Sequence, residues 1–143
     1  LFNEIGGSMG PIYGTVFMDM AGAGADLDII DTPALARMIR AGLDGLFDVV
    51  EARVGDKTLV DTLDPACAAL EKAAASGLAL SEALPLMRDA AKAGWESTKD
   101  LAAKFGRSSR LGERSRGVYD AGATSCWFIL DALSAGILEN QHD

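Results

Sequence analysis

The segment 31–50 reads DTPALARMIRAGLDGLFDVV, and its apolar residues recur at intervals of three and four. This spacing places them along one face of an α-helix. Asp31 or Thr32 is a suitable N-cap, because an oxygen-bearing side chain there accepts a hydrogen bond from the first turn, and Pro33 fits the first helical position. The stretch therefore predicts an amphipathic helix that buries one face against other helices. The apolar positions are Leu35, Met38, Ile39, Leu43, Leu46, Phe47 and Val50.

Helical spacing also dominates the rest of the chain, and no stretch shows the sustained alternation typical of a strand. Four further helices are expected at about 11–23, 58–75, 81–104 and 122–138. The helix at 122–138 is the most apolar, so we expect it to be central. Five helices of similar length joined by short loops indicate antiparallel neighbours. The predicted fold class is all-α, an antiparallel up-and-down helical bundle or barrel.

Composition limits the classes of function. The 143 residues are 49% hydrophobic and 24% charged, which suits a single folded domain spanning 1–143. The net charge of −8 argues against a nucleic-acid partner. No apolar run approaches the roughly 18–20 residues of a membrane span, so we expect no membrane partner. The only histidine, His142, lies next to the last residue, which argues against a metal site.

The two cysteines bear on the cellular location. Cys67 and Cys126 both fall within predicted helices. We interpret them as reduced core residues, with a disulfide as the alternative, because reduced thiols in helices are typical of cytoplasmic proteins. The expected location is therefore cytoplasmic.

A basic loop stands out in this acidic chain. Between Lys104 and Arg116 there are five basic residues and one acidic residue, with glycines and serines between the arginines. This pattern favours a bound anion, because guanidinium and backbone N–H groups suit phosphate oxygens. A solvated linker is the alternative. Asp120, in the segment DAGATS that follows, is either a helix N-cap or a polar ligand contact.

Two other glycine-bearing segments precede predicted helices. Gly6–Gly10 can expose backbone N–H groups to a phosphate or form a plain tight turn. Gly55–Thr58 ends like a phosphate-binding loop, but Val50 stands where that motif needs glycine. A helix cap involving Asp56 is the alternative there. In an up-and-down bundle the first, third and fifth helices begin at the same end, so these segments and Asp120–Ser125 can converge on one nucleotide.

Four segments together resemble the nucleotide-binding, L-type subunit of dihydroxyacetone (glycerone) kinase. They read GGSMGPIYGT at 6–15, GDKT at 55–58, GRSSRLGERS at 106–115 and DAGATS at 120–125. The resemblance implies an all-α barrel of eight antiparallel helices with a nucleotide at one rim. It also implies transfer of a phosphoryl group from ATP, or from a bound ADP that is recharged, to dihydroxyacetone or a related short ketose or polyol. The implied partners are a K-type subunit that holds the substrate and, in some systems, a phosphotransferase-system phosphoryl donor protein.

The resemblance also implies a set of nucleotide-binding residues, without a catalytic or metal-binding residue among them. Leu59 corresponds to an apolar residue against the base, and Arg107 to an arginine that contacts the nucleotide. Met9 stands where the family usually has serine, which leaves only a backbone N–H group, and Ala121 replaces the proline of an Asp-Pro-Gly segment. The implied set is Ser8, Met9, Leu59, Arg107, Asp120, Ala121 and Gly122.

The family's magnesium ligands, aspartates in a Gly-Asp-x-Asp-His-Gly motif, have no counterpart in this chain. Because about five helices are predicted where eight are expected, we expect the domain to lack its N-terminal helices and the Mg²⁺ ligands to lie upstream of Leu1. Phosphoryl transfer depends on such a metal, so the chain alone should be inactive as a kinase component. The alternative function is a non-catalytic nucleotide- or phosphate-sensing module of the same fold.

Overall fold

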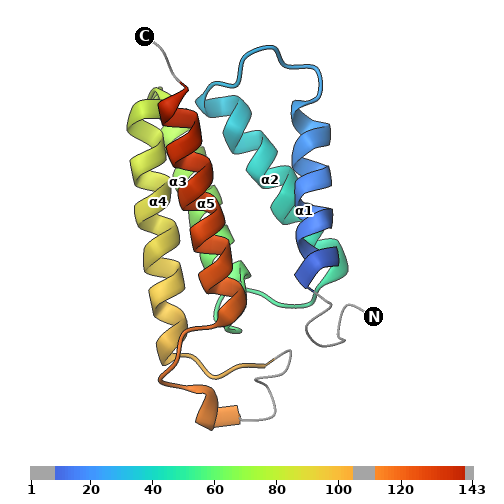
Figure 1. The fold of residues 1–143 in the computed structure, drawn as a ribbon, viewed down its shortest axis with the longest axis vertical. Coiled ribbons are helices and arrows are strands. Elements are labelled where there is room, and N and C mark those ends of the chain that lie inside the picture. The colour runs from blue at the N-terminus through green and yellow to red at the C-terminus, as the bar shows by residue number, and fades with distance from the viewer. Residues whose placement is uncertain (1–8, 105–111, 141–143) are drawn as a thin grey trace.

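The computed structural model describes residues 9–104 and 112–140 (Figure 1). Within these ranges the chain is all-α, as predicted, and contains no strand. Each expected helix is present, together with the short 3₁₀ helix η2. The elements are α1 (Met9–Gly24), α2 (Thr32–Val49), α3 (Val60–Ala75), α4 (Leu80–Ser97), η2 (Thr98–Asp100) and α5 (Ala121–Glu139).

Local capping sets the ends of α2 and α3 as the sequence predicts. The Asp31 side chain accepts a hydrogen bond from the Ala34 N–H at 2.9 Å, and Pro33 lies in the first turn of α2. After α3, Gly77 adopts a φ of +74°, a left-handed conformation that glycine adopts without steric cost. The predicted N-cap of α2 and the predicted end of α3 near residue 75 are both confirmed.

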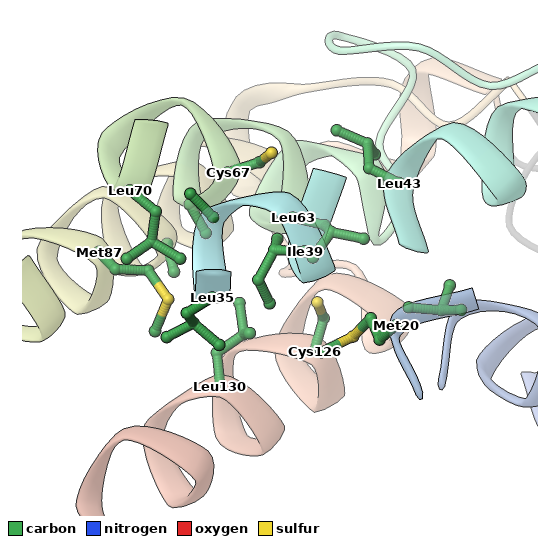
Figure 2. Close-up of a cluster of buried hydrophobic side chains, with 14 of the residues drawn as sticks. Met20, Leu35, Ile39, Leu43, Leu63, Cys67, Leu70, Met87, Cys126 and Leu130 are labelled. Carbon is green, nitrogen blue, oxygen red and sulfur yellow. The ribbon is translucent and has the colours of Figure 1, made fainter. Parts of the chain in front are cut away.

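Each helix packs against the next in an antiparallel array, and α5 also contacts α3 (Figure 1). The pair α3 and α4 lies especially close, because a Cβ at Gly94 would be only 2.0 Å from the Asp61 carbonyl oxygen. All five α-helices contribute to the core (Figure 2). Its labelled residues are Met20, Leu35, Ile39, Leu43, Leu63, Cys67, Leu70, Met87, Cys126 and Leu130.

The prediction that the last helix is central is wrong. Helix α5 packs against α4 and α3 and hydrogen-bonds to Tyr13 of α1, but few of its residues are buried and Phe128 on it is 57% exposed. Apolar composition favours burial, but the number of helices that pack against α5 determines how many of its side chains are buried. Helix α5 is long and apolar enough to cross a membrane, judged by length and composition only. Of its 18-residue apolar window, 22% is buried. This is weak evidence, because helices from protein cores meet the same criteria.

The fourth helix ends at Ser97 rather than near Lys104, so its predicted length is also wrong. The backbone that follows it is engaged by distant parts of the chain. The Gly117 N–H donates to the Lys99 carbonyl at 2.7 Å, and Lys57 donates to the Leu101 carbonyl at 3.1 Å. These tertiary hydrogen bonds replace the ones that would continue the helix.

Candidate functional site

The N-terminal ends of α1, α3 and α5 lie at the same end of the array (Figure 1), as the predicted topology requires. The Tyr13 hydroxyl of α1 donates to the Gly122 carbonyl of α5 at 3.2 Å and lies 2.7 Å from the Ser125 hydroxyl oxygen. Thr62 of α3 donates to the Ala123 carbonyl at 2.9 Å. Side-chain hydrogen bonds therefore hold the three helix ends together. Helix N-termini favour anions, because their first N–H groups have no partner within the helix.

The Tyr13 hydroxyl is protonated at neutral pH and acts as a hydrogen-bond donor. Burial raises its pKa above the usual value of 10.0, and the neighbouring Cys126 adds to this effect, while the hydrogen bond with Ser125 opposes it. The group therefore stays protonated and can donate the hydrogen bond to Gly122 that joins α1 to α5.

Asp120 is the N-cap of α5. Its Oδ2 accepts from the Ala123 N–H at 2.8 Å, and its own N–H donates to Thr98 Oγ1 at 3.0 Å. Burial raises the pKa of Asp120, whereas the Ala123 hydrogen bond and then the charge of Lys57 act in the opposite direction. Of the two interpretations open from the sequence, the structure confirms the cap, and the ligand contact stays a prediction.

The first turns of α5 and α1 are accessible. Ala121 and Gly10 are exposed, and Gly122 is half-buried. Within residues 9–104 and 112–140, a Cβ added at Gly10 would meet no atom within 4 Å. Met9 is the first residue of α1, which places its backbone N–H group at the helix N-terminus.

Two of the predicted nucleotide-binding residues, Ser8 and Arg107, lie outside the described residues. The remaining five fall at the starts of α1, α3 and α5. The structure thus brings Met9, Leu59 and the segment Asp120–Gly122 to one end of the array, and the contacts of Ser8 and Arg107 stay predictions.

Leu59 is buried rather than open to a ligand. It stands at the N-cap position of α3 and is 5% exposed. It lines a cavity of about 20 Å³ between α1, α3 and α5, together with Tyr13 and Cys126. Such a space holds about one water molecule and is too small for a nucleobase. Contact of Leu59 with a base stays a prediction, and it requires neighbouring side chains to move.

The loop at Gly55–Thr58 is organised by a carboxylate that the sequence analysis missed. Asp61, 3% exposed, accepts from the Gly55 N–H at 2.7 Å and from the Thr58 N–H at 2.9 Å. These two N–H groups are therefore occupied by protein and do not face a phosphate. The signal available in the sequence was an aspartate three residues beyond Thr58, a spacing that permits a local side-chain-to-backbone hydrogen bond.

Asp56 does not cap α3, so that alternative is wrong as well. Its Oδ2 accepts from the Arg53 N–H at 2.9 Å, and its Oδ1 lies 3.2 Å from Lys104 Nζ. The carboxylate thus connects the segment before the loop to the stretch that follows α4.

Lys57 is the second residue whose role the sequence did not indicate. It is 2% exposed, and its ammonium donates to three backbone carbonyls. Desolvation lowers the pKa of Lys57, and the nearby Asp120 carboxylate opposes that effect. The acceptors are the carbonyls of Leu101 at 3.1 Å, Ser115 at 2.5 Å and Val118 at 2.6 Å.

A groove of about 600 Å³ lies along the C-terminal half of α5, away from the site. Its walls are mostly apolar and carry no charged side chain, so they offer nothing that would hold a phosphate. The lining residues are Ile29, Ile30, Leu80, Ala132, Leu133, Gly136, Ile137 and Asn140.

The described residues do not fit a magnesium site. Across 9–104 and 112–140, no group of three or more histidine, cysteine, aspartate or glutamate side chains could hold a metal ion. A hard cation such as Mg²⁺ needs carboxylate oxygens brought together. The acidic side chains nearest the site, Asp61 and Asp120, instead accept backbone hydrogen bonds.

Comparison with known proteins relates this geometry to a family. The family model described as the DAK2 domain matches residues 1–135. The chain is 36% identical, over 93% of its length, to the ADP-binding subunit DhaL of PEP-dependent dihydroxyacetone kinase 1 from Listeria innocua. It is 34% identical, over 97% of its length, to the ADP-binding subunit DhaL of the Escherichia coli PEP-dependent dihydroxyacetone kinase. It spans 61% and 66% of these two relatives.

A larger relative shares the same region. The chain is 35% identical, over 93% of its length, to the L-erythrulose kinase of Pectobacterium atrosepticum and covers 22% of that protein. The similar region therefore occurs both in separate subunits and as part of a longer kinase.

Proposed function

The chain belongs to the DAK2 domain family, and from this premise we propose that it is the nucleotide-binding component of a dihydroxyacetone-type kinase. In this role it binds ADP or ATP, and a phosphoryl group passes from the nucleotide to a short ketose or related polyol. The observation that carries the proposal is the convergence of the α1, α3 and α5 N-termini in a chain similar to ADP-binding subunits.

The proposed binding chemistry is electrostatic. The N-terminal turns of α1 and α5 direct N–H groups toward the phosphates, and Arg107 adds a guanidinium that suits phosphate oxygens. Asp120 shapes the first turn of α5 through its cap. Phosphoryl transfer needs mainly this kind of positioning and charge stabilisation from the protein.

The proposal also includes a magnesium ion and two protein partners. Because the described carboxylates form no magnesium site, we propose that any Mg²⁺ ligands come from sequence upstream of Leu1. The substrate would be held by a K-type subunit, and a phosphotransferase-system protein would recharge the nucleotide. The name of a Lactococcus lactis relative that is 33% identical, the ADP-binding subunit DhaL of a PTS-dependent dihydroxyacetone kinase, supports that second partner. A cytoplasmic location agrees with two free cysteines.

The test is calorimetric titration of ADP, with and without Mg²⁺, into the chain and into the same chain preceded by its natural upstream sequence. Replacing Arg107 with alanine should weaken ADP binding about tenfold or more, because a charge-assisted hydrogen bond is lost. The matched control is Arg37→Ala, which removes an exposed arginine from α2. Absence of ADP binding at millimolar concentration in both proteins would refute the proposal.

A second candidate, a non-catalytic nucleotide- or phosphate-sensing module, is favoured by the departures at Met9 and Ala121. The two functions separate in an assay containing the upstream sequence, a K-type subunit, ATP and dihydroxyacetone. Formation of dihydroxyacetone phosphate supports the kinase. ADP binding without any phosphoryl transfer supports the sensing module.

A further inference from the structure

We propose that Lys57 is a positioning residue for the nucleotide site, holding the backbone on both sides of residues 105–111 against the start of α3. This inference rests on the proposed function for its consequence on nucleotide affinity. Lys57 itself touches no ligand in the proposal. It acts through the backbone stretches 101–104 and 112–118, the second of which leads into Asp120.

The hydrogen-bond geometry uses every donor of the ammonium group. The Lys57 Nζ donates to the carbonyls of Leu101, Ser115 and Val118 at 3.1, 2.5 and 2.6 Å. A lysine ammonium has three N–H donors, so none is left over in a side chain that is 2% exposed. Burying an unsatisfied charge is costly, and these three acceptors together compensate for lost water.

The two stretches that Lys57 joins also bond to each other. The Ala103 N–H donates to Ser115 Oγ at 2.8 Å, and that hydroxyl donates to the Gly112 carbonyl at 2.6 Å. The Gly117 N–H donates to the Lys99 carbonyl at 2.7 Å. Because the Lys57 acceptors lie on both stretches, its ammonium joins both of them to the loop ahead of α3, and the Asp56–Lys104 ion pair adds a second contact to the first stretch.

The contact continues into the first turn of α5. Val118, whose carbonyl accepts from Lys57, is two residues before Asp120. The Asp120 N–H is held by Thr98, and the Asp120 carboxylate caps α5. The position of the α5 N-terminus therefore depends on backbone that Lys57 restrains.

The backbone of Lys57 indicates that its side chain is required there. Its φ is +63°, and it is the one non-glycine residue with positive φ among those described. Glycine or asparagine adopts this conformation more readily than lysine. A lysine at such a position is explained by the three bonds that its ammonium makes.

The test compares Lys57→Met with the unmodified chain, because methionine is unbranched and only one atom shorter than lysine, while it removes the charge and all three donors. Lys72→Met makes the same chemical change at an exposed position of α3. Met87→Ala, in the core (Figure 2), serves as a control for general loss of stability. Each protein is examined by hydrogen exchange of backbone amides without nucleotide and by ADP titration.

For Lys57→Met we expect about tenfold faster exchange of the Ala103, Gly117 and Asp120 amides, and about tenfold weaker ADP binding. Core amides of α2 and α3 should keep their protection. Lys72→Met should match the unmodified chain, and Met87→Ala should lose stability without a selective effect on the three reporter amides.

Unchanged exchange at the three amides in Lys57→Met would overturn the inference. Faster exchange with unchanged ADP affinity would overturn the positioning role, as would an equal loss of ADP affinity in Met87→Ala at matched stability. If the unmodified chain and its upstream-extended form bind no ADP, the proposed function fails. The exchange data then decide alone whether Lys57 holds the two stretches.

Discussion

Asp61 and Lys57 are 3% and 2% exposed, and each satisfies polar groups of backbone outside the α-helices. Asp61 accepts from two N–H groups of the loop before α3. Lys57, which belongs to the same loop, donates to three carbonyls of the segment between α4 and α5. Buried polar groups without partners are expensive. These two side chains therefore make an irregular loop compatible with the interior.

Replacing Asp61 with asparagine should destabilise the protein by about 1–3 kcal/mol, because the amide NH₂ cannot accept a hydrogen bond and one buried N–H group loses its partner. The measurement is urea unfolding followed by circular dichroism. Asp89→Asn, an exposed change on α4, should shift stability by less than about 0.5 kcal/mol. Equal stability of the two variants would contradict the assigned role of Asp61.

The two cysteines should be inert in the folded protein. Burial raises the pKa of both Cys67 and Cys126 to about 12, so the reactive thiolate is scarce at pH 8. Mass spectrometry should show slow labelling by iodoacetamide in buffer and fast labelling of both thiols in concentrated urea. Comparable labelling rates in the two conditions would contradict the burial of these thiols. The structure confirms that both cysteines are free.

At the scale of elements, side-chain pairs connect helices whose positions local sequence already predicts. Arg40 of α2 makes two hydrogen bonds to Glu71 of α3, at 2.9 and 2.7 Å. Tyr13 connects α1 to α5, and Thr62 connects α3 to α5. These contacts set how the amphipathic helices face one another once their apolar sides are buried.

Glu71→Gln should reduce stability at pH 7 by about 0.5–1 kcal/mol, a modest value because the Arg40 and Glu71 side chains are both more than a third exposed. Arg40 holds the pKa of Glu71 below its usual 4.5. A carboxylate whose pKa is lower in the folded protein than in the unfolded chain stabilises the fold fully at pH values above its pKa in the unfolded chain. This contribution is lost as the pH falls through the pKa that the group has in the folded protein.

The stability difference between the original protein and Glu71→Gln should therefore shrink as the pH is lowered from about 5 into the acid range below 4.5. Urea unfolding at several pH values measures it. The control is Glu96→Gln, at an exposed position of α4. A difference that stays constant down to the most acidic pH would contradict the assigned pair.

Asp120→Asn separates the two roles proposed for Asp120. Asparagine is as good an N-cap as aspartate, so α5 should keep its stability to within about 0.5 kcal/mol, whereas Asp120→Ala should lose about 0.5–2 kcal/mol. ADP titration of the asparagine variant then reports on the charge alone. Weaker binding supports a ligand contact, and unchanged binding leaves the cap as the role of this residue.

At the scale of the whole molecule, α1 and α5 contact each other and both keep large apolar side chains at the surface. Phe17 and Met18 on α1 are 44% and 76% exposed, and Phe128 on α5 is 57% exposed. Large exposed apolar side chains promote association where they gather into a patch.

The chain should accordingly bind the dye ANS in its folded state and sediment as a concentration-dependent mixture. The double variant Met18→Lys with Phe128→Lys should lower both signals, because a charge on each of the two helices opposes apolar contact. Asp89→Lys, at an exposed polar position of α4, is the control for added charge. Absence of ANS binding by the original chain would contradict this prediction.

Local sequence signals predicted the helices, several of their ends and their order, because periodicity and N-caps act within a few residues. It also predicted that the starts of α1, α3 and α5 share one end, since short loops force neighbouring helices to run antiparallel. Asp120 as a cap and the two reduced cysteines follow from equally local signals.

The end of α4 at Ser97, the low burial of α5 and the three backbone hydrogen bonds of Lys57 depend on tertiary packing. The three acceptors of Lys57 lie 44, 58 and 61 residues away in sequence. No local pattern encodes such partners, because their proximity arises only after the apolar faces have packed. Hydrogen bonds made across that distance fix the backbone near Asp120, where the proposed nucleotide would bind.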